Sequence, residues 1–256
     1  MVNISGMKMF AEFLGTFILA ASIEFVTVYD QGSQTNLLIA ILAGFYAAIT
    51  VTREISGGHI NPGVTLTVYL AETDEREKTE QANQLWMYIV SQVAGAVSAA
   101  MLGMVLYREN IFKLAINPKN SPAEALVMEI IGSALFYSCI LIQGDKDAKL
   151  NYDKSISTLT ITAGLGAGIA IAGNVSGACL NPALGFGFNF GRLLTTGKIE
   201  ECKFLWLYIL GPVLGAFLAN YFYQNIFRKY FELENSDEKK QKLIEMNTDN
   251  LNDIMS

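Results

Sequence analysis

The sequence carries few charged residues for its length. Only 16% of its 256 residues are Asp, Glu, Lys or Arg, whereas soluble domains usually carry about 25%. The charges are also segregated, because long apolar stretches alternate with short charged patches such as residues 72–78. One large soluble core would not need that alternation. The pattern indicates a protein that crosses a membrane several times.

Histidine, cysteine and clustered basic residues are also scarce, which excludes several classes of protein. The single histidine, His59, lacks companion ligands, so no metal site is expected. The three cysteines, Cys139, Cys179 and Cys202, show no CxxC spacing, so a disulfide framework is not expected either. No basic stripe predicts nucleic-acid binding. Without a nucleophile–base pair or a nucleotide motif, neither an enzyme nor a cofactor is expected.

Six apolar stretches are the candidates for membrane-spanning helices. A helix needs about 20 apolar residues to cross the hydrocarbon layer. Most of these stretches approach that length, and the second and fifth are shorter. The predicted spans are Met9–Val28, Leu37–Thr52, Leu85–Leu106, Ala125–Ile142, Ile156–Gly173 and Phe204–Phe227.

Lysine and arginine are unevenly distributed between the two sides of these spans. With the N-terminus inside, 12 of the 18 basic residues lie in inside segments and 6 lie in outside segments. The positive-inside rule then predicts a multi-pass protein with both termini cytoplasmic. The predicted organisation is a cytoplasmic segment 1–8, a membrane domain 9–228 and a polar cytoplasmic tail 229–256. The tail is expected to be disordered or to form a short amphipathic helix.

Two further apolar segments, Asn61–Leu70 and Asn181–Phe190, are too short to cross a membrane. About ten residues make a helix of about 15 Å, which is half a bilayer. Both segments follow Ser-Gly approaches, at residues 56–60 and 176–180. Irregular backbone at membrane depth is tolerated only where protein buries it or where it lines a watery cavity. These two segments are therefore the predicted functional site.

The two halves of the membrane domain, about residues 9–107 and 123–228, resemble each other. Matching motifs recur in order at offsets of 117, 120 and 120 residues, as the pairs Glu12–Glu129 and Asn61–Asn181 illustrate. Each half has three spans, so the second half must enter the membrane from the opposite side. Such inverted repeats place their site near the midplane.

Each short segment opens on an asparagine–proline pair, in Asn61-Pro62-Gly63 and in Asn181-Pro182-Ala183. An asparagine oxygen caps a helix start well, and proline fits the first helical position. We expect the side-chain NH₂ to stay free to donate into a pore, while Gly63 and Ala183 let the two helix starts approach closely. Two such helix N-termini at mid-membrane oppose cations, and the amides bind the oxygen of a neutral molecule.

These features together resemble the aquaporins and aquaglyceroporins of the major intrinsic protein family. The resemblance covers roughly residues 8–228, and the stretch from Ser56 to Thr65 is its most specific part. It implies an all-α membrane protein with six transmembrane helices and two re-entrant half-helices in an inverted repeat. It also implies a passive channel for water and small neutral solutes in a lipid bilayer, assembled as a homotetramer with one pore per protomer.

The second box departs from the family pattern at the residue that follows it. Most members carry an arginine there, which narrows the pore and adds a positive barrier, whereas this chain carries Leu184. By motif spacing, the other constriction positions match Ile41, Ile169 and Ala178, so the predicted filter is apolar. It either admits glycerol, urea or ammonia, or forms a hydrophobic neck that passes water slowly or gates by dewetting. We favour the broad neutral-solute pore as a hypothesis.

Three acidic residues lie in the predicted spans, where an ionisable group is costly. Glu12 and Glu129 either relay protons or accept hydrogen bonds from backbone N–H groups of the re-entrant loops. Their repeat symmetry and the family resemblance favour the structural role. Glu24 lies near the other end of the first span and is expected to be interfacial.

Two further side chains are candidates for the pore wall. His59 is expected to face the pore or to brace its loop, and Cys179 lies in the second re-entrant loop. Two rival functions remain open. One is an inverted-repeat secondary transporter coupled to an ion through Glu12 or Glu129, and the other is a non-conducting junctional or structural membrane protein of the same fold.

Overall fold

A computed structural model describes residues 4–29, 33–108, 110–145 and 153–234. The described residues form helices and no strand. The helices are α1 (Ile4–Tyr29), α2 (Gln34–Ser56), α3 (Pro62–Ala71), α4 (Glu75–Tyr107), α5 (Pro122–Gly144), α6 (Lys154–Ser176), α7 (Pro182–Thr196), the 3₁₀ helix η1 (Ile199–Cys202), α8 (Leu205–Phe222) and the π-helix η2 (Tyr223–Phe227). The all-α class predicted from the sequence is confirmed.

Six helical stretches are long and apolar enough to cross a membrane. Five of them contain a predicted span, and the first, Ile4–Thr27, ends one residue before the predicted span does. The spans expected to be short, α2 and α6, are in fact 23 residues long each. Both helices continue through polar residues until Gly57 and Gly177, which adopt left-handed φ of 96° and 87°. Glycine tolerates this conformation without a Cβ clash, so it ends the helix.

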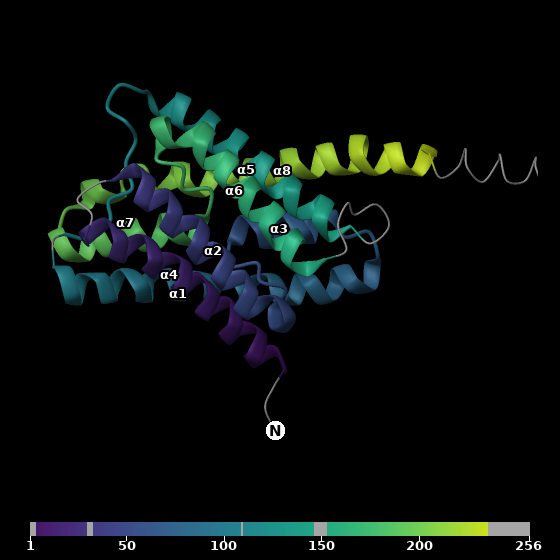
Figure 1. Ribbon diagram of the computed structural model, residues 1–256, viewed down its shortest axis with the longest axis horizontal. Coiled ribbons are helices and arrows are strands. Elements are labelled where there is room, and N and C mark those ends of the chain that lie inside the picture. Colours follow the sequence, from purple (N-terminus) through teal and green to yellow (C-terminus); the bar gives the residue numbers. More distant parts are fainter. Residues whose placement is uncertain (1–3, 30–32, 109, 146–152, 235–256) are drawn as a thin grey trace, which may run out of the picture.

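The two short helices differ in length. The first, α3, has 10 residues as predicted, whereas α7 has 15 and runs past the predicted end at Phe190 to Thr196. The left-handed Gly197, with φ 68°, ends α7. Figure 1 shows α3 toward one end of the helix bundle and α7 toward the other. Their N-termini lie close together, because the capping residues Asn61 and Asn181 each donate a hydrogen bond to the loop before the other helix.

The two halves pack in the same way. In the first half α1 packs against α2 and α4, and in the second α5 packs against α6 and α8. A Cβ added at Gly95 would lie 2.4 Å from the carbonyl oxygen of Phe13, and one at the repeat-related Gly215 would lie 2.6 Å from Cβ of Ser133. Such small residues let membrane helices approach closely. Each short helix also contacts the other half, α3 against α8 and α7 against α4.

The end of α8 holds the end of α3 in place. Asn220 Nδ2 donates to the carbonyl oxygen of Thr67 at 2.8 Å, and Gln224 Nε2 donates to that of Ala71 at 2.9 Å. The carbonyl of Ala71 is one that the last turn of a helix leaves without an intrahelical partner, so the bond from Gln224 satisfies it. Residues 228–234 continue as a helix that projects from the bundle (Figure 1), and the rest of the predicted tail lies outside the described residues.

Candidate functional site

The two Asn-Pro boxes form the N-terminal caps of α3 and α7. Asn61 Oδ1 accepts a hydrogen bond from the backbone N–H of Gly63 at 2.8 Å. Asn181 Oδ1 accepts from the backbone N–H of Ala183 at 3.0 Å. Pro62 and Pro182 occupy the first helical positions, where no hydrogen bond is lost. The local structure is therefore the one that the residue types predict.

The two asparagines also bind the opposite loops. Asn61 Nδ2 donates to the carbonyl oxygen of Leu180 at 2.8 Å, and Asn181 Nδ2 donates to that of Ile60 at 3.0 Å. The expectation that each NH₂ group is wholly free is therefore wrong, because one hydrogen of each amide pairs a loop carbonyl at membrane depth. We call these two crossed hydrogen bonds the Asn joint. An amide nitrogen carries two hydrogens, so one hydrogen of each asparagine remains outside the Asn joint.

The residues just before the boxes have strained backbone. Ile60 and Leu180 adopt positive φ of 44° and 49°, and Ala178 adopts 50°. Positive φ is rare for residues other than glycine and is an outlier for a bulky one. Such strain persists only where surrounding contacts fix it, and it gathers at functional sites. It turns both loops sharply into the helix starts.

Glu12 fixes the first of these loops. Its Oε1 accepts from Ser56 Oγ at 2.6 Å and from the backbone N–H of His59 at 3.0 Å. Its Oε2 accepts from the backbone N–H of Ile60 at 2.6 Å and from Gln92 Nε2 at 2.7 Å. The side chain is fully buried, so these donors provide the partners that a buried carboxylate needs.

Glu129 fixes the second loop with the same geometry. Its Oε1 accepts from Ser176 Oγ at 2.6 Å and from the backbone N–H of Cys179 at 2.8 Å, and its Oε2 accepts from that of Leu180 at 2.8 Å. This side chain is also fully buried. Both carboxylates thus lie beneath the strained loops and hold their N–H groups.

A tyrosine explains why the first box ends in glycine. Tyr137 is fully buried in α5, and its hydroxyl donates to the carbonyl oxygen of Leu180 at 2.9 Å. A Cβ added at Gly63 would lie 2.0 Å from this hydroxyl oxygen. The second box has Ala183 at the equivalent place. The glycine at the end of the first box therefore has a steric cause.

We expect Gly63→Ala to lower the stability of the folded protein by about 1–3 kcal/mol, the usual cost of overpacking a core. Thermal unfolding of the purified protein in detergent measures it. In combination with Tyr137→Leu, which removes the ring, Gly63→Ala should cost clearly less than it does alone. Ala183→Gly is the matched control and should change the melting temperature little. A Gly63→Ala protein as stable as the parent would refute the steric explanation.

The four predicted filter residues line one cavity. This narrow cavity has a volume of about 50 Å³, and Ile41, Ile169, Ala178 and Leu184 are all among its walls. Its other walls are mainly leucine, isoleucine and phenylalanine, and the described residues that line it carry no charge. Polar groups reach it from Asn61, Asn181 and Cys179. The structure therefore brings the filter candidates together beside the Asn joint.

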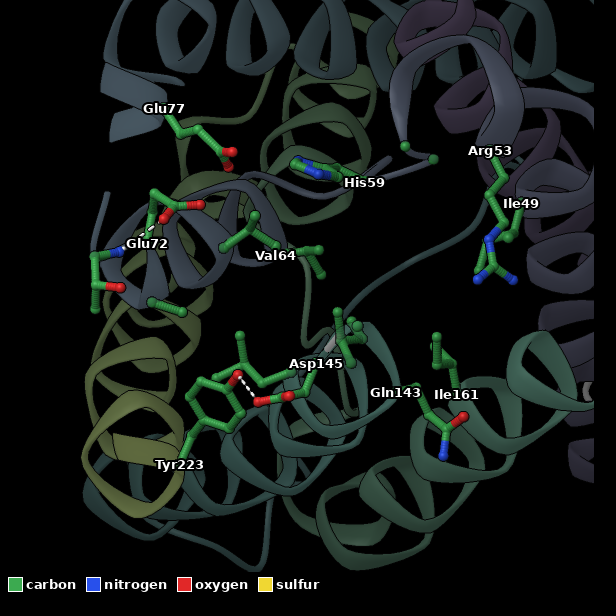
Figure 2. A pocket seen from close by; sticks show the side chains of 18 of the residues that line it. Ile49, Arg53, His59, Val64, Glu72, Glu77, Gln143, Asp145, Ile161 and Tyr223 are labelled. Atoms are coloured by element: carbon green, nitrogen blue, oxygen red, sulfur yellow. Dashed lines mark hydrogen bonds between the residues drawn. The ribbon is translucent and has the colours of Figure 1, made fainter. Parts of the chain in front are cut away.

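A second, wide cavity of about 450 Å³ lies on the other side of the joint. Ile49 and Arg53 of α2 line it, whereas Ile41 of the same helix lines the narrow cavity, and Phe45 touches both. Figure 2 shows Arg53 on one side of the wide cavity and the acidic Glu72 and Glu77 on the other. The wide cavity is thus polar at its mouth.

Several contacts hold the mouth of the wide cavity in place. The backbone N–H groups of Asp74 and Thr73 donate to Glu72 and lower the pKa of its carboxyl group. The hydroxyl of Tyr223 donates to Asp145, as the dashed line in Figure 2 marks. The charged groups at this mouth are therefore fixed by hydrogen bonds from neighbouring elements.

His59 lies at the inner end of the wide cavity (Figure 2). Its Nδ1 is 3.3 Å from Thr65 Oγ1, and its ring meets the ring of Tyr88 edge-on at 5.3 Å. Cys179, 9% exposed, donates from Sγ to the carbonyl oxygen of Asn181 at 3.1 Å. The described residues contain no group of three or more potential metal ligands.

The sequence led us to expect Glu24 at the membrane interface, and this expectation is wrong. Its side chain is fully buried, and its Oε2 accepts from the backbone N–H of Phe112 at 2.8 Å. The cause is the connection between α4 and α5, which folds back into the bundle and covers the end of α1. The sequence reasoning also missed Tyr137 and Phe112. The mostly apolar stretch 111–116, interrupted only by Lys113, was the available signal for Phe112.

Comparisons with known proteins point to one family. The family model described as "Major intrinsic protein" matches residues 3–223. A curated protein named "Aquaglyceroporin" from Toxoplasma gondii is 28% identical over 213 residues, which are 83% of this chain and 76% of that protein. The "Glycerol uptake facilitator protein-like 6" of Lactiplantibacillus plantarum is 32% identical over 226 residues, 83% of this chain and 94% of that one.

A solved structure supports the same fold. The X-ray structure of the aquaglyceroporin from Plasmodium falciparum superposes with a TM-score of 0.76. The match covers 90% of this chain and 99% of the other, at 21% sequence identity. At that identity the likeness concerns the fold alone.

Proposed function

Because this chain belongs to the major intrinsic protein family, whose members are membrane channels and not enzymes, we propose a passive pore for water and small uncharged solutes that passes between its two Asn-Pro boxes. The chain is an integral membrane protein with several spans and the fold of the aquaglyceroporins. Within that family, the proposal names Asn61, Pro62 and Gly63 with Asn181, Pro182 and Ala183 as the central constriction.

The observation that carries the proposal is the position of the asparagine joint between the two cavities. One amide N–H of each asparagine is used in the joint and one remains. The remaining hydrogens can donate to the oxygen of a passing water, alcohol or amide. The N-termini of α3 and α7 meet at the same place, and their partial positive charge opposes cations. Both features favour neutral solutes.

The narrow cavity supports the proposal of an apolar filter formed by Ile41, Ile169, Ala178 and Leu184. Leu184 is 5% exposed and stands where most family members carry arginine. The apolar walls of the narrow cavity offer a solute few hydrogen-bond partners besides those of the two asparagines. Such a filter selects by size and by the cost of removing water, rather than by charge. A solute with a carbon skeleton, such as glycerol, loses less hydration free energy there than an ion does.

The geometry of the acidic residues argues against the transporter alternative. A carboxylate that couples transport to protons must exchange its partners during the cycle. Glu12 and Glu129 instead accept short hydrogen bonds from loop groups in fixed positions, on both oxygen atoms of each carboxylate. We propose that they serve as braces for the re-entrant loops.

The orientation and assembly are part of the same proposal. The excess of lysine and arginine on the side of the termini favours cytoplasmic termini, which places the wide cavity at the cytoplasmic mouth. The resemblance to the family implies a homotetramer with one pore in each protomer. Residues 9–228 would form the channel domain, with the residues on either side in the cytoplasm.

Reconstituted protein tests the proposal directly. Stopped-flow light scattering on proteoliposomes would compare water, glycerol, urea and ammonia, each with and without a proton gradient. We expect flux above that of empty liposomes for water and at least one other solute, without saturation and without dependence on the gradient. Water permeability alone would refute the broad pore. Saturable, gradient-dependent flux would support a transporter, and absence of any flux would support the non-conducting alternative.

A further inference from the structure

The connection between α4 and α5 enters the bundle instead of lying on its surface. Ile111 is 4% exposed and Leu114 is 9% exposed. Asn117 donates from its backbone N–H to the carbonyl oxygen of Val175 and from Nδ2 to that of Asn174, both at 2.9 Å. We call residues 111–117 the inserted segment. It is bound to the approach of the second re-entrant loop, beside the narrow cavity.

Phe112 of the inserted segment forms part of the wall of that cavity. It lines the narrow cavity together with Ile41, Ile169 and Leu184. Its ring packs edge-on against the ring of Phe188 of α7, with centroids 4.8 Å apart. The constriction therefore has a wall that no transmembrane helix provides. The position of this ring affects the free cross-section of a cavity of only about 50 Å³.

The position of Phe112 depends on Glu24. The carboxylate accepts the backbone N–H of Phe112 at 2.8 Å, and it is fully buried in the bundle. Gly103 of α4 leaves room for the carboxylate, since a Cβ there would lie 3.2 Å from Glu24 Oε2 and 3.4 Å from Ile111 Cγ2. The site is thus shaped around this contact.

Charged residues of α7, η1 and the inserted segment lie around this contact. Arg192 of α7 acts electrostatically on Glu24 and binds Glu201 Oε1 at 3.0 Å. Lys113 of the inserted segment lies 4.0 Å from Glu201 Oε2. An ionisable side chain within a membrane span is a functional candidate by default. Neither the Asn joint nor the loop braces uses Glu24.

We propose that Glu24 is a positioning residue, which holds Phe112 as a fifth wall of the apolar filter and so sets the largest solute that passes. This inference rests on the proposed channel function and extends it to selectivity. Without the acceptor, the inserted segment loses its bond to α1 and the ring moves away from the cavity. The pore then becomes wider, and the permeability to glycerol rises more than the permeability to water, because water already fits.

The experiment measures the glycerol-to-water permeability ratio in proteoliposomes of the full chain. Phe112→Ala should raise the ratio several-fold, and Glu24→Ala should raise it in the same direction. Glu24→Gln keeps an acceptor oxygen and should leave the ratio near the parent value. Phe25→Ala is the control, because Phe25 is also an aromatic residue near the end of α1, packs against Tyr107 and does not line the narrow cavity.

The double variant separates positioning from a general structural role. In the Phe112→Ala background, Glu24→Ala should add nothing to the ratio, because its effect passes through that ring. Glu24→Leu removes the acceptor at similar volume and replaces Glu24→Ala if the latter is not monodisperse. Additive effects, or an unchanged ratio in Phe112→Ala, would overturn the inference while leaving a conducting parent as a channel. A parent that conducts nothing would overturn both proposals.

Discussion

Replacing Leu184 with arginine is expected to lower glycerol permeability by at least about tenfold, which corresponds to about 1.4 kcal/mol in the barrier. Water permeability should fall less. Leu184 is 5% exposed and lies against a cavity of about 50 Å³. The longer side chain occupies part of that space, and its guanidinium supplies donors that water satisfies more compactly than glycerol does. The filter would then select by hydrogen bonding as well as by size.

Stopped-flow permeabilities of the two proteins, reconstituted at equal density, provide the measurement. Leu184→Met is the matched control, because it keeps the apolar character and nearly the volume of leucine. We expect the methionine variant to retain the parental glycerol-to-water ratio. A Leu184→Arg protein that is folded and keeps that ratio would remove this residue from the selectivity mechanism.

Replacing Glu129 with leucine is expected to prevent the formation of a stable protein. The change removes the acceptor for Ser176 Oγ and for the backbone N–H groups of Cys179 and Leu180. The Ser176 hydroxyl can still donate to the carbonyl oxygen of Ala172, 3.2 Å away, so two backbone N–H groups lose their acceptor. A buried donor without a partner costs about 1–3 kcal/mol, so the two cost about 2–6 kcal/mol. That loss is a large part of the stability of a typical protein, about 5–15 kcal/mol. Glu12→Leu removes the acceptor for a fourth donor and should be at least as severe.

Yield of monodisperse protein after size exclusion, and thermal unfolding of whatever folds, would measure this effect. Glu54→Leu is the control, since that carboxylate is exposed and its ion pair with Lys154, at 2.9 Å, is exposed as well. The control should keep the parental melting temperature. A Glu129→Leu variant with parental yield and melting temperature would show that the loop does not depend on the brace.

The helices and the boxes could be predicted from the sequence because local signals encode them. Apolar length gave the six spans, and the Asn-Pro pairs gave both short helices and their caps. The repeat offset indicated which residues correspond between halves. These signals depend on neighbouring residues or on chain symmetry, so one sequence without its structure is enough to recognise them.

Other features could not be predicted because they depend on contacts between distant segments. The burial of Glu24 results from the inserted segment 88 residues later, and nothing near Glu24 signals it. The role of Tyr137 depends on how α5 meets the first box, 76 residues earlier. The extra donor to Glu12 is Gln92, whose repeat counterpart is Pro212, so symmetry alone gives the wrong expectation there.

The crossed bonds of the asparagine joint also impose an order on biosynthesis. The carbonyl of Ile60 is synthesised long before Asn181, its partner, and the amide of Asn61 likewise precedes Leu180. Until the second half is inserted, these polar groups lack their partners, and hydrocarbon cannot replace them. The first re-entrant loop therefore reaches its final form only after translation has passed the second box. A chain truncated before the second box would keep the Ile60 carbonyl and the Asn61 amide without these partners, unlike the full chain.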